Sequence, residues 1–277
     1  DFEKDFSFER SLLRENEAER LLREAKYLIE GVKITNKESF VYHFQPPFSE
    51  SETLLDVEFD CHSLLPSRLL AIVGKNGVGK TQMMSCFPID LSHKKQENFE
   101  PQLPLFSKVI SVSTSPYDHC HYPDKSNEFN YEYIGLTIKD GVNRRIITND
   151  EIDSKLQASC KLVNTKERAK SLKNILEEIL PETIVETLFQ ESDGKYLLNT
   201  DVVKDVRQKL SSGESTLLYL LTSVVSTLRF DTLLLFDEPE THLHPNAITT
   251  LISALYKLLE EFQSYAIVAT HSPLVIR

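Results

Sequence analysis

Apolar residues in this chain gather in short continuous runs that alternate with helical repeats, a pattern typical of an α/β domain. Three runs, 69–73, 232–236 and 265–270, have the length of strands that are buried in a parallel sheet. A helical repeat that begins after Pro245 and ends at Phe262 separates the last two runs. This order predicts parallel strands joined by a crossover helix, with ligands binding where the strands end.

Smaller strands are expected before and between these runs. Alternating or apolar segments predict strands at 40–44, 54–59 and 108–113. A further pair of segments, 131–138 and 144–148, flanks Asp140-Gly141, a favoured turn pair, and predicts a hairpin. Residues 88–104 are polar and contain prolines, so a loop or short insertion is expected there.

Two segments have the periodicity of helices. Residues 8–30 form an amphipathic repeat that ends at Gly31, which predicts a helix on the domain edge, with a partner-binding arm as the alternative. Residues 150–210 also predict helices, and Pro181 stops one of them. The chain is therefore expected to comprise an N-terminal helical segment (1–37), a lobe with an antiparallel β-subdomain (38–149), a helical lobe (150–209) and the remainder of the first lobe (210–277).

The run 69–73 leads into a phosphate-binding motif. Residues 74–81 fit the pattern G-x-x-x-x-G-K-[ST] at every required position, with a predicted strand before and a helix after. Glycines let backbone N–H groups turn toward phosphates, Lys80 suits the β- and γ-phosphates, and the Thr81 hydroxyl suits Mg²⁺. We expect nucleotide contacts from Gly74, Lys75, Asn76, Gly77, Val78, Gly79, Lys80, Thr81 and Gln82.

Candidate catalytic residues follow the other two apolar runs. Asp237 and Glu238 come directly after 232–236, and His271 comes directly after 265–270. The carboxyl ends of parallel strands meet at one edge of a sheet, so these side chains should lie near the phosphate loop. Asp237 suits a role in ordering Mg²⁺ through its water shell, Glu238 in polarising the attacking water, and His271 in contacting the γ-phosphate.

The charge and composition of the chain limit the kinds of partner that it is expected to bind. The 277 residues carry a net charge of −11, so any nucleic-acid contact should come from a local patch. Basic residues cluster in the helical region, where a solvated helix face is the alternative: Lys161, Lys166, Arg168, Lys170, Lys173, Lys204, Arg207 and Lys209. No run approaches the ~20 apolar residues of a membrane helix, so no membrane is expected. Four scattered cysteines and an isolated His119-Cys120-His121 lack metal or disulfide spacing, which predicts a cytoplasmic protein.

Together the motifs resemble ATPase heads of the ATP-binding-cassette (ABC) type, of the structural-maintenance-of-chromosomes (SMC) kind. Residues 74–81 match the Walker A motif, 210–214 the signature motif, 233–239 Walker B, and His271 the switch histidine. The segments 237–245 and 269–273 carry a narrower variant, DEPETHLHP followed by ATHSP. This variant is similar to prokaryotic ATPases that accompany nucleases in anti-phage systems: the ATPases of Septu, Gabija and retron systems and the overcoming-lysogenization-defect (OLD) enzymes.

The resemblance implies a P-loop NTPase of ABC-ATPase type, with a parallel core sheet, an antiparallel β-subdomain and a helical lobe. It implies that ATP and Mg²⁺ bind between two heads of a homodimer, where Ser212, Gly213 and Glu214 of one subunit complete the site of the other. His242 and His244 would lie in the segment that crosses this interface, with helix-start packing as the alternative. The implied partner is an effector protein, a nuclease of HNH or other type, with nucleic acid as a further component.

Other functions remain open from the sequence. A DNA-repair or recombination ATPase that binds DNA ends, a transporter cassette and a slow assembly switch are the alternatives. The glutamine that usually follows the strand after Walker A is not obvious in 113–118, where Asp118 is a candidate substitute. The stretch from Thr81 to Leu210 is too short for a long coiled-coil arm, which disfavours a chromosome-scale clamp.

Overall fold

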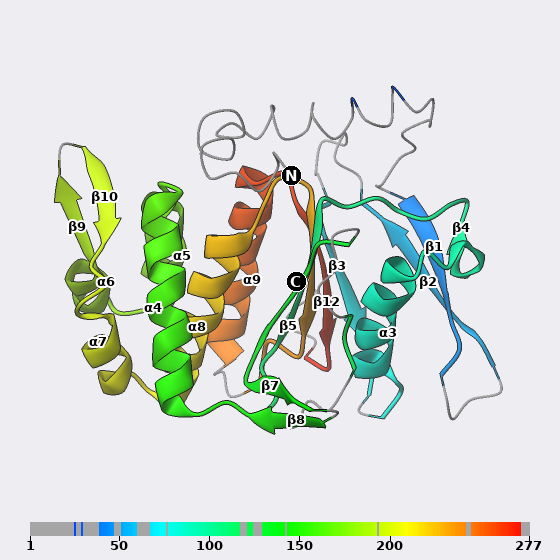
Figure 1. Cartoon of the computed structure of the whole chain (residues 1–277), viewed down its shortest axis with the longest axis horizontal. Helices are drawn as coiled ribbons and strands as arrows, with labels where there is room; N and C mark the ends of the chain where they lie inside the picture. Colours follow the sequence, from blue (N-terminus) through cyan, green and yellow to red (C-terminus); the bar gives the residue numbers. More distant parts are fainter. Residues whose placement is uncertain are drawn as a thin grey trace.

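A five-stranded parallel sheet forms the centre of the computed structural model (Figure 1). The structure describes residues 25, 29, 39–46, 51–59, 67–75, 77–116, 121–123, 129–141, 143–192, 194–241 and 245–272. In spatial order the strands are β3 (Leu69–Val73), β12 (Tyr265–Thr270), β11 (Thr232–Asp237), β5 (Lys108–Ser113) and β6 (Tyr131–Gly135). Strand β12 therefore lies between the strands that precede the phosphate loop and the acidic turn.

Side chains of the sheet alternate between two hydrophobic cores. Leu234 and Phe236 of β11 face a core shared with the helices α4 (Asn149–Thr165), α5 (Ala169–Ile179), α8 (Ser212–Thr227) and α9 (Pro245–Glu261). Leu233 and Leu235 face a core shared with α3 (Lys80–Ser92), β1 (Ser39–Phe44), β2 (Thr53–Glu58) and β4 (Phe99–Glu100). Figure 1 shows these two groups of elements on opposite sides of the sheet. Continuous apolar strands are required because both faces are covered.

The antiparallel β-subdomain packs on α3, the helix that follows the phosphate loop. Its strands have the order β2-β1-β4, and aromatic rings fill the space between them and the helix. The Tyr42 ring centroid lies 4.9 Å from that of Phe87 and 5.0 Å from that of Phe99. The Tyr42 hydroxyl donates to Asp90 Oδ2 of α3 at 2.8 Å. Burial, followed by the Asp90 charge, raises the pKa of Tyr42, so its hydroxyl stays a donor.

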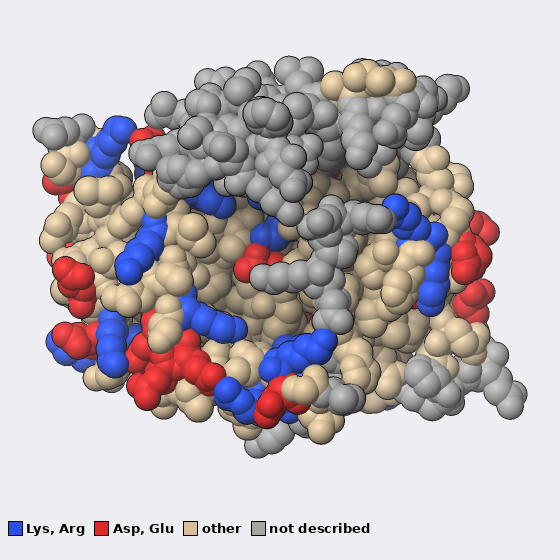
Figure 2. Space-filling view, in the orientation of Figure 1, with Lys and Arg blue, Asp and Glu red and all other residues tan. Residues whose placement is uncertain are grey.

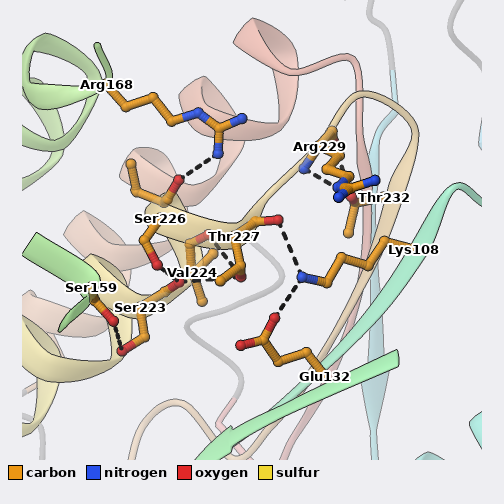
Figure 3. Close-up of polar contacts among 11 residues, drawn as sticks. Lys108, Glu132, Ser159, Arg168, Ser223, Val224, Ser226, Thr227, Arg229 and Thr232 are labelled. Carbon is orange, nitrogen blue, oxygen red and sulfur yellow. Dashed lines mark hydrogen bonds and ion pairs between the residues drawn. The ribbon is translucent and has the colours of Figure 1, made fainter. Parts of the chain in front are cut away.

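Helix α8 is buried along most of its length, as its apolar sequence predicts. Two cationic side chains bind the carbonyl groups of its last turn (Figure 3). Lys108 Nζ of β5 donates to Thr227 O at 3.3 Å and forms an ion pair with Glu132 of β6 at 2.5 Å. Arg168 Nη1 donates to Val225 O at 2.8 Å. Cations are favourable at a helix C-terminus, so these contacts fix α8 to the sheet and to the helical lobe.

The helical lobe contains α4, α5, α6 (Glu182–Leu188) and α7 (Val203–Lys209). It also contains a hairpin of β9 (Phe189–Ser192) and β10 (Lys195–Leu198), although only helices are predicted for 150–210. The Asn164 side chain of α4 holds the hairpin by bonding both Leu198 N and Leu198 O at 2.8 Å. The prediction of an entirely helical region is therefore wrong at 189–198.

Two boundaries also differ from the prediction. Helix α3 continues through Pro88 to Ser92, where a loop is predicted, because its apolar face packs in the second core. Beyond it lie a 3₁₀ turn, η2 (Gln96–Asn98), and β4. The predicted hairpin around Asp140-Gly141 is shorter than expected: β7 (Thr137–Asp140) pairs with β8 (Asn143–Ile146), while Tyr131–Gly135 joins the parallel sheet as β6.

Strand β3 differs in burial. Residues 69–73 are predicted to be fully buried, but β3 is an edge strand of the parallel sheet, and its residues are half-buried or exposed. The predicted N-terminal helix, 8–30, lies outside the described residues apart from Ala25 and Ile29.

Cys86 and Cys160 are free thiols, and burial raises the pKa of Cys160 to about 12. Among the described helices, none is both long and apolar enough to cross a lipid bilayer.

Candidate functional site

The phosphate loop leaves the edge strand β3 and enters α3. Gly77 and Gly79 adopt φ values of +84° and +95°, a region that favours glycine. A Cβ atom on Gly74 would lie 3.0 Å from Val78 Cγ2, closer than most real contacts. The backbone conformation therefore favours glycine at 77 and 79, and the Val78 side chain favours it at 74.

Lys80 folds back onto its own loop. Its side chain is buried, and Nζ donates to Gly74 O at 2.6 Å and to Lys75 O at 3.1 Å. The first turn of α3 has no side-chain cap and no acidic residue. A helix N-terminus without competing side chains favours a bound anion, and the ammonium group adds a positive charge beside it.

Thr81 and Gln82 follow in the first turn and are half-buried. The Oε1 atom of Gln82 is buried, and no described group donates a hydrogen bond to it. A buried amide oxygen without a donor is a natural acceptor for a bound ligand or its water shell. Together with the glycine cradle and Lys80, this fits a nucleotide phosphate group with Mg²⁺ held near Thr81.

The acidic turn follows β11, the central strand. Asp237 is the last residue of β11 and is buried. Glu238 adopts a left-handed φ of +47°, which is unusual for a residue other than glycine. Its N–H donates to Ala269 O at 2.8 Å, and its carbonyl accepts from Thr114 Oγ1 at 2.7 Å. A hydrogen bond to β12 and one from the residue that follows β5 thus hold the turn in place.

Glu240, the fourth residue of this turn, lies under the segment that carries His271. Its Oε1 atom accepts hydrogen bonds from Thr270 Oγ1 at 2.6 Å, His271 N at 2.7 Å and Ser272 N at 3.3 Å. The His271 Nδ1 atom lies 3.0 Å from the same oxygen and 3.9 Å from Glu238 Oε1. Both predicted catalytic side chains, Glu238 and His271, are therefore on one surface, with Glu240 behind them.

The pairing of the strands brings the phosphate loop, the acidic turn and His271 together at the carboxyl end of the sheet. Thr270 of β12 pairs with Val73 of β3, and Ala269 pairs with Asp237 of β11. Gly74 N also donates to Thr270 O at 3.4 Å, which connects the phosphate loop to the end of β12. The structure thus places the phosphate loop, the acidic turn and the histidine at the carboxyl ends of three consecutive strands, as the sequence predicts.

The signature residues begin α8. Ser211 is the N-cap and forms a capping box with Glu214, whose Oε2 accepts from Ser211 N at 2.9 Å and Ser211 Oγ at 2.7 Å. Ser212 is exposed and Gly213 is buried. The Glu214 carboxylate is therefore engaged in starting the helix, which is a local role that the sequence prediction does not include.

Ser212 is the first residue of α8. It borders a cavity of about 240 Å³ that is lined by residues of α4, α7, α8 and the β7–β8 region, together with Pro116. None of the lining residues comes from 74–81 or 237–240.

Comparison with known proteins agrees with this geometry. Residues 126–277, more than half of the chain, match the profile of a family described as "AAA domain, putative AbiEii toxin, Type IV TA system". The match includes the signature segment, the acidic turn and His271. The chain belongs to this AbiEii-type AAA family. Its fold is that of a P-loop ATPase of ABC type, and the predicted fold class is confirmed.

Other similarities extend beyond this AbiEii-type AAA segment. Protein Ea59 of Escherichia phage lambda is 27% identical over 263 residues, covering 82% of this chain and 50% of Ea59. The chain therefore spans about half the length of this curated relative. Two solved structures are similar at 14% identity and a TM-score of 0.42. One is CbiO1 of Clostridium perfringens, part of the ABC transporter complex CbiONQ, and the similarity covers 84% of this chain and 78% of CbiO1. The other is a metal-chelate type ABC transporter in an inward-facing conformation, and the similarity covers 87% of this chain and 76% of that chain.

Several basic residues of the AbiEii-type chain have internal partners. Arg207 is buried and pairs with Asp153 at 2.6 Å, and Lys204 lies 3.4 Å from the same carboxylate. Arg168 binds α8 and lies over the Phe262 ring, and Lys173 pairs with Glu177. Figure 2 shows basic and acidic side chains side by side over the helical half of the molecule. These four residues match the interpretation as an ordinary helical surface better than that as a basic patch.

Some predicted positions lie outside the described residues: Asn76, Asp118, His119, Cys120, His242 and His244. Among the described ones, sequence reasoning missed Glu240 and Thr114. Glu240 stands in the motif DEPE, but only the first two acidic residues have an expected role. Thr114 gives no signal in the sequence, since its contact with Glu238 depends on strands that are 124 positions apart.

Proposed function

We propose that this chain is an Mg²⁺-dependent ATPase head that acts as a head-to-head homodimer in the cytoplasm. Its ATP cycle would control a partner effector, a nuclease of HNH or other type, in a prokaryotic anti-phage defence complex. The observation that carries the proposal is the placement of Glu238 and His271 on strand ends adjacent to the Lys80 loop. A base, a polar switch residue and a phosphate cradle at one sheet edge fit phosphoryl transfer to water.

Each residue has a definite task in this scheme. Lys80 would exchange its two loop carbonyls for phosphate oxygens, since an ammonium group binds an anion more strongly than neutral carbonyls. Thr81 and Asp237 would hold Mg²⁺, which when bound neutralises charge on the β- and γ-phosphate oxygens. Glu238, about a third exposed, would accept a hydrogen bond from the attacking water and orient it.

A second subunit is part of the proposal. Because the cavity beside Ser212 includes no residue of its own phosphate loop, a partner's Ser212 and Gly213 are the natural groups to close over the γ-phosphate. The Ser211–Glu214 capping pair uses the N–H groups of Ser211 and Glu214, so those of Ser212 and Gly213 would be the donors to that anion. ATP would then stabilise the dimer, and hydrolysis would loosen it.

The family description and the phage relative support the proposed biological setting. The family description names a type IV toxin–antitoxin system, and Ea59 comes from a phage. Both are consistent with conflict between phage and host, and the DEPETHLHP variant favours a nuclease as the effector. Direct binding of DNA ends by this chain is less favoured, because Arg168 and Arg207 make internal contacts.

The test is Glu238→Gln, which keeps the shape of the side chain and removes its basicity. Steady-state turnover of Mg·ATP should fall by about 100-fold, a typical loss for a general base. ATP affinity should stay within a few-fold, and sedimentation should show more ATP-bound dimer than for the unaltered protein. Glu182→Gln, the same change at an exposed position on α6, is the matched control and should leave turnover unchanged.

Equal turnover in Glu238→Gln and the unaltered protein would contradict the assigned base. A chain that stays monomeric with ATP would refute the dimer while leaving hydrolysis intact. Co-purification of the full-length protein, followed by mass spectrometry, tests the effector, and the recovery of no nuclease would count against a defence complex.

A further inference from the structure

Glu240 is more deeply buried than the predicted catalytic residues. Its side chain is 4% exposed, compared with 30% for Glu238 and 47% for His271. One carboxylate oxygen, Oε1, accepts three hydrogen bonds from residues 270–272 and also contacts His271 Nδ1 at 3.0 Å. A buried carboxylate is costly unless it is well bonded, so this concentration of donors indicates a specific structural task.

The contact with His271 selects between the two ring nitrogens. A carboxylate can only accept hydrogen bonds, so an Nδ1 atom that lies 3.0 Å from it is favoured to carry a proton. Glu238 Oε1, at 3.9 Å, is too far from Nδ1 for a hydrogen bond. Of these two carboxylates, Glu240 is therefore the closer one to Nδ1.

We propose that Glu240 is a positioning residue that holds His271 with its Nδ1 atom protonated and its Nε2 atom available to the nucleotide. This assignment rests on the proposed ATPase function, in which His271 contacts the terminal phosphate. Glu240 acts only through His271 and does not itself touch the substrate. A carboxylate that orients a histidine is a familiar arrangement at catalytic and metal sites, where it fixes the tautomer and the ring direction.

The same carboxylate also connects two parts of the site. Glu238 N is bonded to Ala269 O, and Glu240 is bonded to Thr270, His271 and Ser272. The turn that carries the base and the segment that carries the histidine are thus held together at both ends. A shift of His271 on nucleotide binding or release must therefore move the Glu238 turn, or break these hydrogen bonds.

The first experiment reads the tautomer of His271 by ¹⁵N NMR of the imidazole ring, at a pH where the ring is neutral and without nucleotide. The resonance is assigned by its loss in His271→Gln. The unaltered protein should show Nδ1–H, whereas Glu240→Ala should shift the ring toward Nε2–H, the form that an unpartnered histidine prefers. Thr270→Val is the matched control, since it removes one donor to Glu240 and should leave Nδ1–H in place.

Conservative variants keep the test decisive if Glu240→Ala does not fold. Glu240→Gln retains an acceptor oxygen and should retain Nδ1–H. Glu240→Asp withdraws the carboxylate by one methylene and should shift the ring toward Nε2–H. An unchanged tautomer in both Glu240→Ala and Glu240→Asp, or Nε2–H in the unaltered protein, would overturn the proposal.

A double-mutant cycle on ATP turnover provides the second readout. Glu240→Ala and His271→Ala should each lower kcat by at least 10-fold. The kcat of the double variant should be no lower than that of the less active single variant. Losses that multiply would mean that the residues act independently, and the positioning role would be wrong. If the unaltered protein does not hydrolyse ATP, the proposed function fails, but the NMR result still decides whether Glu240 sets the His271 tautomer.

Discussion

The phosphate loop and the acidic turn meet at the same sheet edge but are built differently. The loop follows β3, a half-buried edge strand, whereas the turn follows β11, which is buried throughout. Within the loop, the Lys80 side chain donates hydrogen bonds to the carbonyls of Gly74 and Lys75. The turn, in contrast, is bonded through Glu238 to Thr114 and Ala269. One half of the site is thus adjustable, and the other is fixed before any ligand arrives.

Backbone conformation shows the same contrast. Both segments enter the left-handed region, but the loop does so at Gly77 and Gly79, and the turn does so at Glu238. Glycine adopts this conformation without strain, whereas a glutamate there costs roughly 1–2 kcal/mol that the surroundings must offset. The hydrogen bonds from Thr114 and to Ala269 supply that support. A functional side chain can therefore occupy a strained position only where the strands around it are rigid.

The largest expected effect is on the free energy of unfolding, compared between a variant in β11 and a variant in β3. Phe236→Ala removes a fully buried ring in β11 and should lower the free energy of unfolding by about 3–5 kcal/mol. Leu70→Ala, in half-buried β3, should cost less than half as much, because less apolar surface returns to water. Urea unfolding followed by circular dichroism measures both. Equal losses would mean that β3 is as strongly packed as β11.

The next effect tests whether the loop is the adjustable half. Lys80→Ala should weaken ATP binding by about 100-fold, as expected for loss of a charge-assisted contact. The free energy of unfolding without nucleotide should change little, because the lost hydrogen bonds are to the carbonyls of Gly74, which is half-buried, and Lys75, which is exposed. Isothermal titration calorimetry measures the affinity. Lys161→Ala, at an exposed position on α4 outside the phosphate loop, is the control, and a similar loss there would show that the overall charge of the chain matters instead.

The smallest effect concerns a single glycine. Gly77→Ala should destabilise the fold by about 1 kcal/mol through backbone strain alone, because nothing lies within 4 Å of the added Cβ atom. Gly141→Ala is matched in both respects, with a φ of +61° and open space around it, but lies in the β7–β8 turn. Both should lower the melting temperature similarly, while only Gly77→Ala should weaken nucleotide binding. Unchanged affinity in Gly77→Ala would contradict the need for a left-handed residue in the cradle.

Patterns that repeat over several residues were predictable from the sequence. The runs at 232–236 and 265–270 are long, apolar and bounded by polar residues, and the structure has buried strands there. The phosphate motif likewise requires a glycine at position 79, which adopts a positive φ, and Gly77, at a variable position of the motif, does the same. Local chemistry determines these features, so one segment is enough to predict them.

Features that depend on distant partners were not predictable. The run 69–73 is as apolar as a central strand, but its place at the sheet edge is set by the order of the other strands. Pro88 should end a helix by its local chemistry, yet packing of Phe87 and Leu91 in the second core keeps α3 intact. Glu240 has an ordinary sequence context, and its role appears only once 237–240 and 270–272 lie together.

The contacts at the end of α8 have a mechanical consequence. This helix has 16 residues, or roughly 24 Å at 1.5 Å per residue, and Lys108 and Arg168 clasp one end of it. The other end carries Ser212. Because α8 is buried along most of its length, we expect a displacement at its exposed first residue to move the helix as one unit. A displacement at Ser212 would therefore be carried along the full length of α8, through Lys108 and Glu132, to β5 and β6 on the far side of the sheet from the phosphate loop.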